Sequence, residues 1–196
     1  MNRDELLDLF RRCSALLEGH FRLTSGLHSP GYLQCALVLQ HPQHAGVLGA
    51  TLAERVRDLR PTTVLSPALG GLIIGHEVAR ALGARAIFAE REDGVLRLRR
   101  GFSVSEAERV VVVEDVITTG GSTRETMQVA TAAGAQVVAA TAIVNRSGGS
   151  ATLDVPLYAL LDLSLPTYDP DTCPLCANGV PIQKPGSRQV AVPHDQ

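Results

Sequence analysis

The fold prediction for this chain starts from one stretch, Val110-Val-Val-Val-Glu-Asp-Val-Ile-Thr-Thr-Gly-Gly-Ser122. Four β-branched residues in a row are typical of a strand covered on both faces, and residues 122–133 have the pattern of a following helix. The hydroxyl-rich turn between them therefore lies at a helix N-terminus, where backbone N–H groups lack helical partners and favour an anion. Gly120 and Gly121 allow the backbone to approach that anion closely. The stretch predicts a phosphate site.

Two adjacent carboxylates indicate which phosphate ligand fits this turn. Glu114 and Asp115 come at the C-terminal end of the strand, where open α/β sheets bind their ligands. Acidic groups repel a phosphate but accept hydrogen bonds from sugar hydroxyls, so a ribose 5-phosphate suits both halves of the stretch. The turn has neither the Gly-Lys-Ser/Thr of a Walker A loop nor the Gly-x-Gly-x-x-Gly of a dinucleotide site. The alternative is a buried strand followed by an ordinary acidic, glycine-rich turn.

Composition favours a single cytoplasmic domain spanning residues 1–196. A chain of 196 residues with 45% hydrophobic content can bury one sizeable core. Its net charge of −2 gives no reason to expect a nucleic-acid partner, and we find no signal peptide and no apolar run long enough to span a membrane. Four cysteines are too sparse for a disulfide framework, so reduced thiols are expected.

Strand and helix patterns alternate along most of the chain. Strands are expected at residues 63–66, 84–89, 110–114, 136–144 and 156–161, and helices at 4–18, 42–59, 71–82 and 122–133. This order predicts an α/β fold with a central, mainly parallel sheet flanked by helices. Three further segments accompany it: two short strands within 21–35, a charged hairpin within 90–107, and a Pro-rich C-terminal tail at about 169–196 that wraps the surface or frays.

The segment Val112–Thr123 resembles the signature with which type I phosphoribosyltransferases bind phosphoribosyl pyrophosphate (PRPP). The resemblance implies the type I fold with a small N-terminal hood, at about 19–40 here. It also implies a PRPP site made of Glu114, Asp115, Val116, Ile117, Thr118, Thr119, Gly120, Gly121 and Ser122. A second strand-turn-helix segment, Ser66–Gly71, matches the family's pyrophosphate loop at Leu69, Gly70 and Gly71, where a cis non-proline bond is implied. A plain glycine-rich turn is the alternative for that segment.

Two further segments resemble the orotate branch of this family. Gly19–Tyr32 is similar to its hood, in which Tyr32 matches the aromatic residue that faces the pyrimidine. Arg146, after the strand at 136–144, matches the arginine that contacts orotate, and Thr118 is implied to contact orotate too. A guanidinium pairs with a carboxylate through a two-pronged fork, which a carboxylated pyrimidine requires. The alternative for the hood segment is a surface hairpin with a packed tyrosine. The alternative for Arg146 is an ordinary surface arginine.

The resemblance implies Mg²⁺-dependent transfer of ribose 5-phosphate from PRPP to orotate, by a homodimer. The chain departs from the pattern in its charged hairpin, which lacks the lysines and histidine common in the family, and in having Thr24 where the hood often has lysine. We expect arginines to neutralise the pyrophosphate instead, from the group Arg91, Arg97, Arg99 and Arg100. Arg91, with Asp115, is the predicted catalytic residue. A purine phosphoribosyltransferase and a non-catalytic PRPP-binding regulator remain the rival functions.

The tail contains Cys173-Pro-Leu-Cys176, which has the spacing of half a zinc knuckle. Two more ligands are needed, for which Cys13, Cys35 and His194 are candidates, and a symmetric dimer could also join two such halves. The pattern equally fits a tight turn with two free thiols, and the lack of an obvious complete ligand set favours that reading.

Overall fold

The computed structural model describes residues 1–23 and 25–185 and divides into two compact units. The larger unit comprises residues 1–15 and 34–164 and contains the main sheet. The smaller unit combines residues 16–33 with the C-terminal segment that begins at Leu165. Residues 19–33 of the predicted hood thus share a unit with the described part of the tail, whereas residues 34–40 of that hood belong to the larger unit. That all 196 residues form a single domain stays a prediction.

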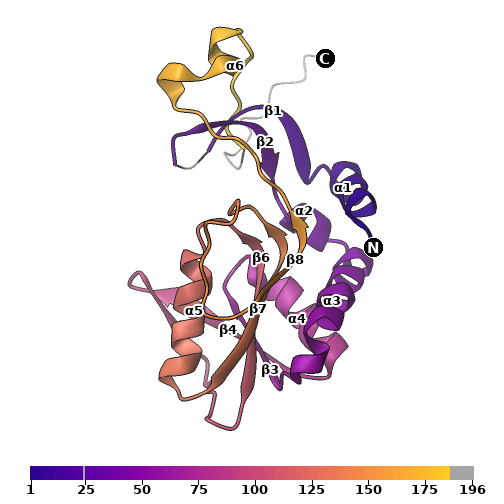
Figure 1. Cartoon of the computed structure of the whole chain (residues 1–196), viewed down its shortest axis with the longest axis vertical. Coiled ribbons are helices and arrows are strands. Elements are labelled where there is room, and N and C mark those ends of the chain that lie inside the picture. The colour runs from indigo at the N-terminus through magenta and orange to yellow at the C-terminus, as the bar shows by residue number, and fades with distance from the viewer. Residues whose placement is uncertain (24, 186–196) are drawn as a thin grey trace, which may run out of the picture. The chain divides into compact units, whose positions relative to one another are not determined.

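The main sheet has six strands in the order β5-β4-β3-β6-β7-β8 (Figure 1). Its strands are β3 (Thr63–Pro67), β4 (Arg85–Glu92), β5 (Val95–Leu98), β6 (Arg109–Ile117), β7 (Gln136–Asn145) and β8 (Leu157–Asp162). All neighbours pair in parallel except β4 and β5, which form an antiparallel hairpin. The predicted α/β class, the mainly parallel sheet and the charged hairpin are therefore confirmed.

Helices cover both faces of this sheet, with α5 on one side and α3 and α4 on the other (Figure 1). The helices of the unit are α1 (Arg3–Arg12), α2 (Ala36–Leu39), α3 (Pro42–Val56), the short η1 (Arg57–Leu59), α4 (Gly71–Leu82) and α5 (Gly121–Ala132). Val110 and Val112 pack in a cluster with Met127 and Ala130 of α5. All four valines from 110 to 113 have no exposed surface, which explains their uninterrupted apolar run. Burial of each contributes about 1.5–3 kcal/mol and fixes β6 at the centre of the sheet.

The helix predicted for residues 4–18 is wrong in its second half. Helix α1 ends at Arg12, and strand β1 (Leu16–Arg22) begins a few residues later. Ser14 has a φ of +52°, which turns the chain out of the helix. The leucines that extend the helical spacing then pair in β1 with β2 (His28–Leu33). Strand pairing with a distant segment overrides the local helical pattern here.

The smaller unit is an antiparallel hairpin of β1 and β2. The C-terminal segment forms a backbone bridge to each of its two edges. His28 and Tyr168 exchange both backbone hydrogen bonds, at 2.9 and 2.8 Å. On the other edge Gln183 bridges to Phe21 in parallel. Between these contacts the segment forms the short helices η2 (Pro170–Thr172) and α6 (Pro174–Ala177). The tail prediction for residues 186–196 lies outside the described residues.

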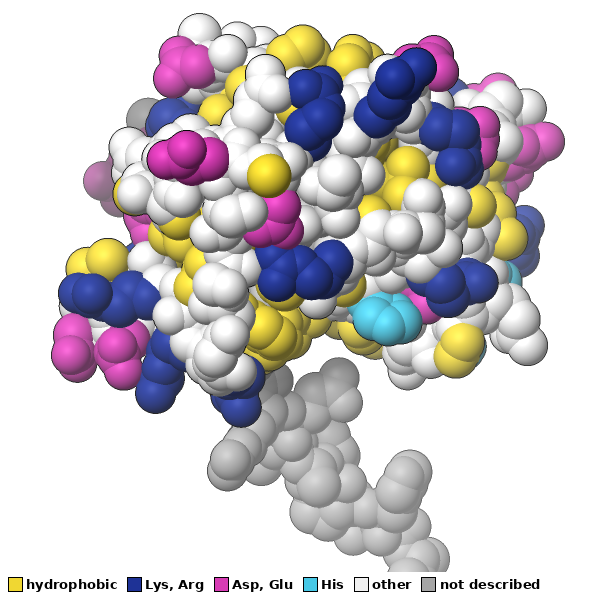
Figure 2. All heavy atoms as spheres, turned by 90° about the horizontal axis from the view of Figure 1, so that it is seen from below, with side chains coloured by type: hydrophobic (Ala, Val, Ile, Leu, Met, Phe, Trp, Pro, Cys, Tyr) yellow, Lys and Arg dark blue, Asp and Glu magenta, His cyan; other side chains and the backbone are white. Residues whose placement is uncertain are grey.

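Charged side chains on the surface are intermixed rather than gathered by sign. On the face shown in Figure 2, Lys and Arg side chains lie among Asp, Glu and hydrophobic side chains. Several arginines of the larger unit pair with nearby carboxylates, as Arg80 does with Glu77 at 2.6 Å and Arg57 with Glu54 at 2.7 Å. Such exposed pairs contribute about 0–1 kcal/mol each. Within the described part of the chain, no helix has the length and apolar character needed to cross a bilayer.

Candidate active site

The candidate site lies at the C-terminal edge of the central strands. Strand β6 pairs in parallel with both β3 and β7, so the loops that follow these three strands leave the sheet at one edge. These loops contain residues 68–70, 118–120 and 146–156. Leu69 and Gly70, Thr118 to Gly120, and Arg146, which are predicted to contact pyrophosphate, the 5-phosphate and orotate, lie in these loops at one edge of the sheet.

The predicted phosphate turn, residues 118–120, depends on the backbone conformation of Gly120 and on hydrogen bonds from Arg124. Gly120 has a φ of +75° and is the N-cap of α5, which has no side-chain cap. Arg124 donates hydrogen bonds to the carbonyl oxygens of Thr119 (3.0 Å) and Thr152 (3.2 Å), and these bonds hold the turn against the loop after β7. Thr118 and Ser122 are exposed. Backbone donors and hydroxyls thus face solvent at a helix N-terminus, which is the arrangement that binds a phosphate.

The acidic pair is buried, and this changes its protonation. Glu114 is only 7% exposed, and burial together with the charge of Asp115 raises the pKa of Glu114 to about 8. Burial also raises the pKa of Asp115, whose Oδ1 accepts a hydrogen bond of 2.8 Å from the backbone N–H of Val116. Glu114 therefore keeps its proton at neutral pH in the unliganded protein. A protonated carboxyl such as that of Glu114 can donate a hydrogen bond to a sugar hydroxyl as well as accept one.

The loop after β3 approaches this acidic pair closely. A Cβ atom added at Gly70 would lie 2.6 Å from Oδ1 of Asp115, and one added at Gly71 would lie 2.7 Å from the carbonyl oxygen of Val113. The Ala68–Leu69 peptide bond is cis, as the family resemblance implies, and the Leu69 side chain is 82% exposed. Helix α4 begins directly after this loop without a side-chain cap. Two uncapped helix N-termini therefore flank one pair of carboxyls.

Arg146 is joined through its backbone to the C-terminal end of β6. Its backbone N–H donates to the carbonyl oxygen of Ile117 at 2.7 Å, which ties the loop after β7 to the start of the phosphate turn. Burial and the charge of Asp115 raise the pKa of Cys35 well above its ordinary value, and the charge of Arg146 opposes that rise. The Cys35 thiol is in turn 4.0 Å from the carbonyl oxygen of Asp115. The charge of Arg146 thus acts on Cys35, whose thiol lies near the backbone of Asp115.

The arginines of the β4–β5 hairpin are held by neighbouring acidic residues. Arg91 lies within β4, where it pairs with Glu125 of α5 at 2.9 Å and donates to the carbonyl oxygen of Gly94. Arg100 donates two hydrogen bonds to Glu90, at 2.7 and 2.8 Å. Because Glu125 is on the helix that begins at the phosphate turn, its ion pair holds Arg91 near that helix. The catalytic role of Arg91 stays a prediction.

The remaining predicted residues belong to the smaller unit. Tyr32 lies on β2, half-buried, with its ring centroid 6.0 Å from that of Phe21. Thr24 lies outside the described residues. Cys173 and Cys176 form a close group with His20 and His28, whose four ligand atoms all lie within 4.8 Å of one another.

Two of the three partners predicted for these cysteines are wrong, because Cys13 and Cys35 are not members of this group. The third, His194, lies outside the described residues. His20 and His28 were not predicted, although both lie in the hood segment. The observed register pairs His28 with Arg22, two residues after His20. Such diagonal positions share one face of a hairpin.

Comparison with known proteins agrees with the fold and the site. The family model of the phosphoribosyl transferase domain matches residues 37–161. Orotate phosphoribosyltransferases of Desulforamulus reducens and Caldicellulosiruptor saccharolyticus are 53% and 52% identical over 190 residues, covering 97% of this chain and 100% of each relative.

Solved structures give the same result. The orotate phosphoribosyltransferase of Mycobacterium tuberculosis in complex with Fe(III) dicitrate matches with a TM-score of 0.70 at 25% identity, over 81% of this chain and 95% of that one. The enzyme of Aeropyrum pernix matches with a TM-score of 0.65 at 27% identity, over 81% and 93% of the two chains. The fold is thus that of the type I phosphoribosyltransferases. The chain belongs to the orotate phosphoribosyltransferase family.

Proposed function

We propose that this protein transfers ribose 5-phosphate from PRPP to N1 of orotate, giving orotidine 5′-monophosphate and pyrophosphate in pyrimidine biosynthesis. The observation that carries the proposal is the acidic pair between two uncapped helix N-termini, with Glu114 buried and Asp115 partly buried. One helix terminus suits the 5-phosphate and the other suits the pyrophosphate. The carboxyls suit the ribose hydroxyls between the two anions, and Arg146 suits the carboxylate of orotate.

The reaction needs little covalent chemistry from the protein. Pyrophosphate departs from the anomeric carbon through a cation-like transition state, and N1 of orotate takes its place, so positioning and charge stabilisation account for most of the catalysis. Glu114 and Asp115 orient the ribose ring through its hydroxyls. The turn from Thr118 to Ser122 holds the 5-phosphate. The backbone of Leu69–Gly71 and the side chain of Arg91 stabilise charge on the pyrophosphate as it leaves.

Base recognition is assigned to Arg146, Thr118 and Tyr32. Arg146 pairs with the orotate carboxylate, Thr118 contributes a hydroxyl, and Tyr32 offers an aromatic face to the pyrimidine. A purine base has no carboxylate that could form this two-pronged pair with the Arg146 guanidinium. This argues against a purine phosphoribosyltransferase.

Mg²⁺ is the cofactor that this proposal requires. Glu114 and Asp115 at the end of β6 are assigned to the ribose hydroxyls, so no side chain is proposed as a direct ligand and Mg²⁺ would be held through PRPP. This suits Mg²⁺, a cation that keeps several waters and commonly takes its other ligands from substrate oxygens. When bound with PRPP, Mg²⁺ offsets negative charge on the pyrophosphate. We further infer a cytoplasmic homodimer, as the family resemblance implies.

The decisive experiment supplies PRPP and Mg²⁺ with one of five bases: orotate, uracil, adenine, hypoxanthine or xanthine. Pyrophosphate release with orotate alone supports the proposal. Release with a purine base would overturn the base assignment. Tight PRPP binding without release from any base would favour the non-catalytic regulator instead.

A further inference from the structure

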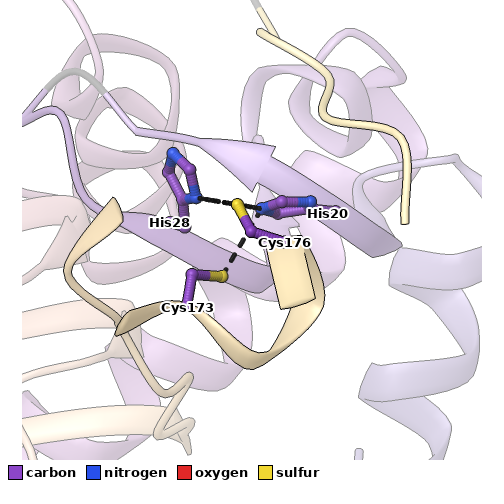
Figure 3. A group of neighbouring side chains, drawn as sticks. All are labelled: His20, His28, Cys173 and Cys176. Carbon is purple, nitrogen blue, oxygen red and sulfur yellow. Dashed lines mark hydrogen bonds between the residues drawn. The ribbon is translucent and has the colours of Figure 1, made fainter. Parts of the chain in front are cut away.

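His20, His28, Cys173 and Cys176 form a compact group in the smaller unit, apart from the residues of the proposed reaction. The two histidines come from adjacent strands, and the two cysteines come from the segment around α6 (Figure 3). His20, His28 and Cys173 are nearly inaccessible to solvent, with 1%, 6% and 2% of their surfaces exposed. Cys176 closes the group on its exposed side. Two histidines and a Cys-x-x-Cys pair are the ligand set of a structural zinc site.

The distances within the group agree with tetrahedral coordination. Zn–N bonds of about 2.0–2.1 Å and Zn–S bonds of about 2.3 Å place two nitrogens about 3.3 Å apart and a nitrogen and a sulfur about 3.6 Å apart. Nε2 of His20 lies 3.0 Å from Nδ1 of His28 and 3.6 Å from Sγ of Cys173. Sγ of Cys176 lies 3.8 and 3.4 Å from the same two nitrogens. These four separations are each within about 0.3 Å of the tetrahedral value, and all ligand atoms of the group lie within 4.8 Å of one another.

The hydrogen bonding of His20 also suits a ligand. Its Nδ1 lies 2.8 Å from the carbonyl oxygen of Val180, to which it can only donate. The other ring nitrogen, Nε2, points into the group, where it can act as a metal ligand (Figure 3). A metal-binding histidine usually has its other ring nitrogen fixed in this way.

The smaller unit has few other means of stability. Its buried apolar side chains, among the described residues, are Phe21, Leu33 and Cys173. Units of this size usually need a metal or disulfides, because a small hydrophobic core does not offset the entropy of ordering the chain. The group also joins positions that are 153 residues apart in the sequence, so one ion would tie the C-terminal segment to the hairpin.

We propose that these four side chains bind one structural Zn²⁺ per chain, through Nε2 of His20, Nδ1 of His28 and the thiolates of Cys173 and Cys176. Two nitrogens and two sulfurs in tetrahedral order favour Zn²⁺ over Mg²⁺, which requires oxygen ligands. The ion holds the C-terminal segment on β1 and β2, and takes no part in the transfer reaction. All four ligands come from one chain, so no symmetric dimer is needed to complete the site.

Elemental analysis of the full-length protein, expressed with zinc and purified without chelator, tests this directly. We expect about one zinc per chain in the parent and about one in the matched controls Cys13→Ser and His76→Gln, which remove a thiol and an imidazole outside the group. Cys173→Ser and His28→Gln should retain less than about a tenth of that zinc. A parent without zinc would overturn the proposal, as would zinc that stays bound in both ligand variants.

Two measurements use the parent protein alone, so they do not require any variant to fold. Co²⁺ loaded after zinc removal should give the intense visible bands of tetrahedral Co²⁺ and a thiolate charge-transfer band, whereas weak octahedral bands would contradict the site. Zinc removal should speed amide hydrogen exchange in residues 173–183 relative to α3 of the larger unit. Unchanged exchange would refute the structural role. A disulfide between Cys173 and Cys176 in freshly purified protein would overturn the proposal in favour of a redox pair.

Discussion

Substitution of Glu114 by Gln should stabilise the unliganded protein, and the gain should grow as pH rises. In the unfolded chain this carboxyl ionises near its ordinary pKa of 4.5, whereas in the folded protein it keeps its proton up to a pKa of about 8. Between these values the folded state binds one proton more than the unfolded state. The free energy of unfolding therefore falls with rising pH because of Glu114, and Gln removes this dependence.

The size of this change in the free energy of unfolding follows from the interval between the two pKa values of Glu114. Each pH unit between the two pKa values costs about 1.4 kcal/mol, so the interval from pH 6 to pH 7.5 costs on the order of 2 kcal/mol. Gln resembles the protonated carboxyl in size and hydrogen bonding, so the two proteins should differ least at the acid end of this interval. For a domain of this size the change corresponds to about 4–8 °C in melting temperature.

The assay is urea denaturation of parent and variant at pH 6.0, 6.5, 7.0 and 7.5, without PRPP. The quantity compared is the difference between their free energies of unfolding, because the other titrating groups are common to both proteins. Glu54→Gln serves as the control, since it removes a carboxylate whose side chain is 67% exposed. A Glu114→Gln difference that stays constant to within about 0.5 kcal/mol over this range would refute the assigned burial and protonation of Glu114.

Three further predictions concern the proposed reaction. Asp115→Asn should lower kcat/KM for PRPP by roughly 10- to 150-fold, since a charged hydrogen bond contributes about 1.5–3 kcal/mol, while its circular dichroism stays that of the parent. Arg146→Ala should raise the KM for orotate by about 10-fold or more, with little change in PRPP binding measured by calorimetry; equal loss of both would indicate a structural role. Arg91→Ala should lower turnover by about 100-fold or more with the melting temperature nearly unchanged, whereas Glu125→Ala, which breaks the same ion pair, should keep turnover near the parent's. Turnover of Arg91→Ala within a few-fold of the parent would show that the hairpin is only a solvated ribbon.

Elements that depend on neighbouring residues were predictable. The order of strands and helices in the larger unit follows the sequence pattern closely, and helix α4 has the predicted bounds, 71–82. The uncapped turn before α5 could also be read from the sequence, because its glycines and hydroxyls are a local requirement. Local patterns fail where a distant partner competes, as in β1, where the spacing of Leu16 and Leu17 fits a helix but their backbone pairs with β2.

The amino-acid sequence alone predicts the chemical groups of the candidate site: a strand ending in two carboxyls, a hydroxyl-rich turn, and the resemblance to a family that uses both. The behaviour of those groups depends on tertiary contacts. The pKa of Glu114 depends on burial by the surrounding elements, and the contact of Gly70 with Asp115 depends on β3 and β6 being neighbours. Likewise, the histidine partners of Cys173 and Cys176 are found only when the C-terminal segment joins the hairpin. Residue types and short spacings can be read directly from the sequence. Proximity between distant segments depends on strand order and packing.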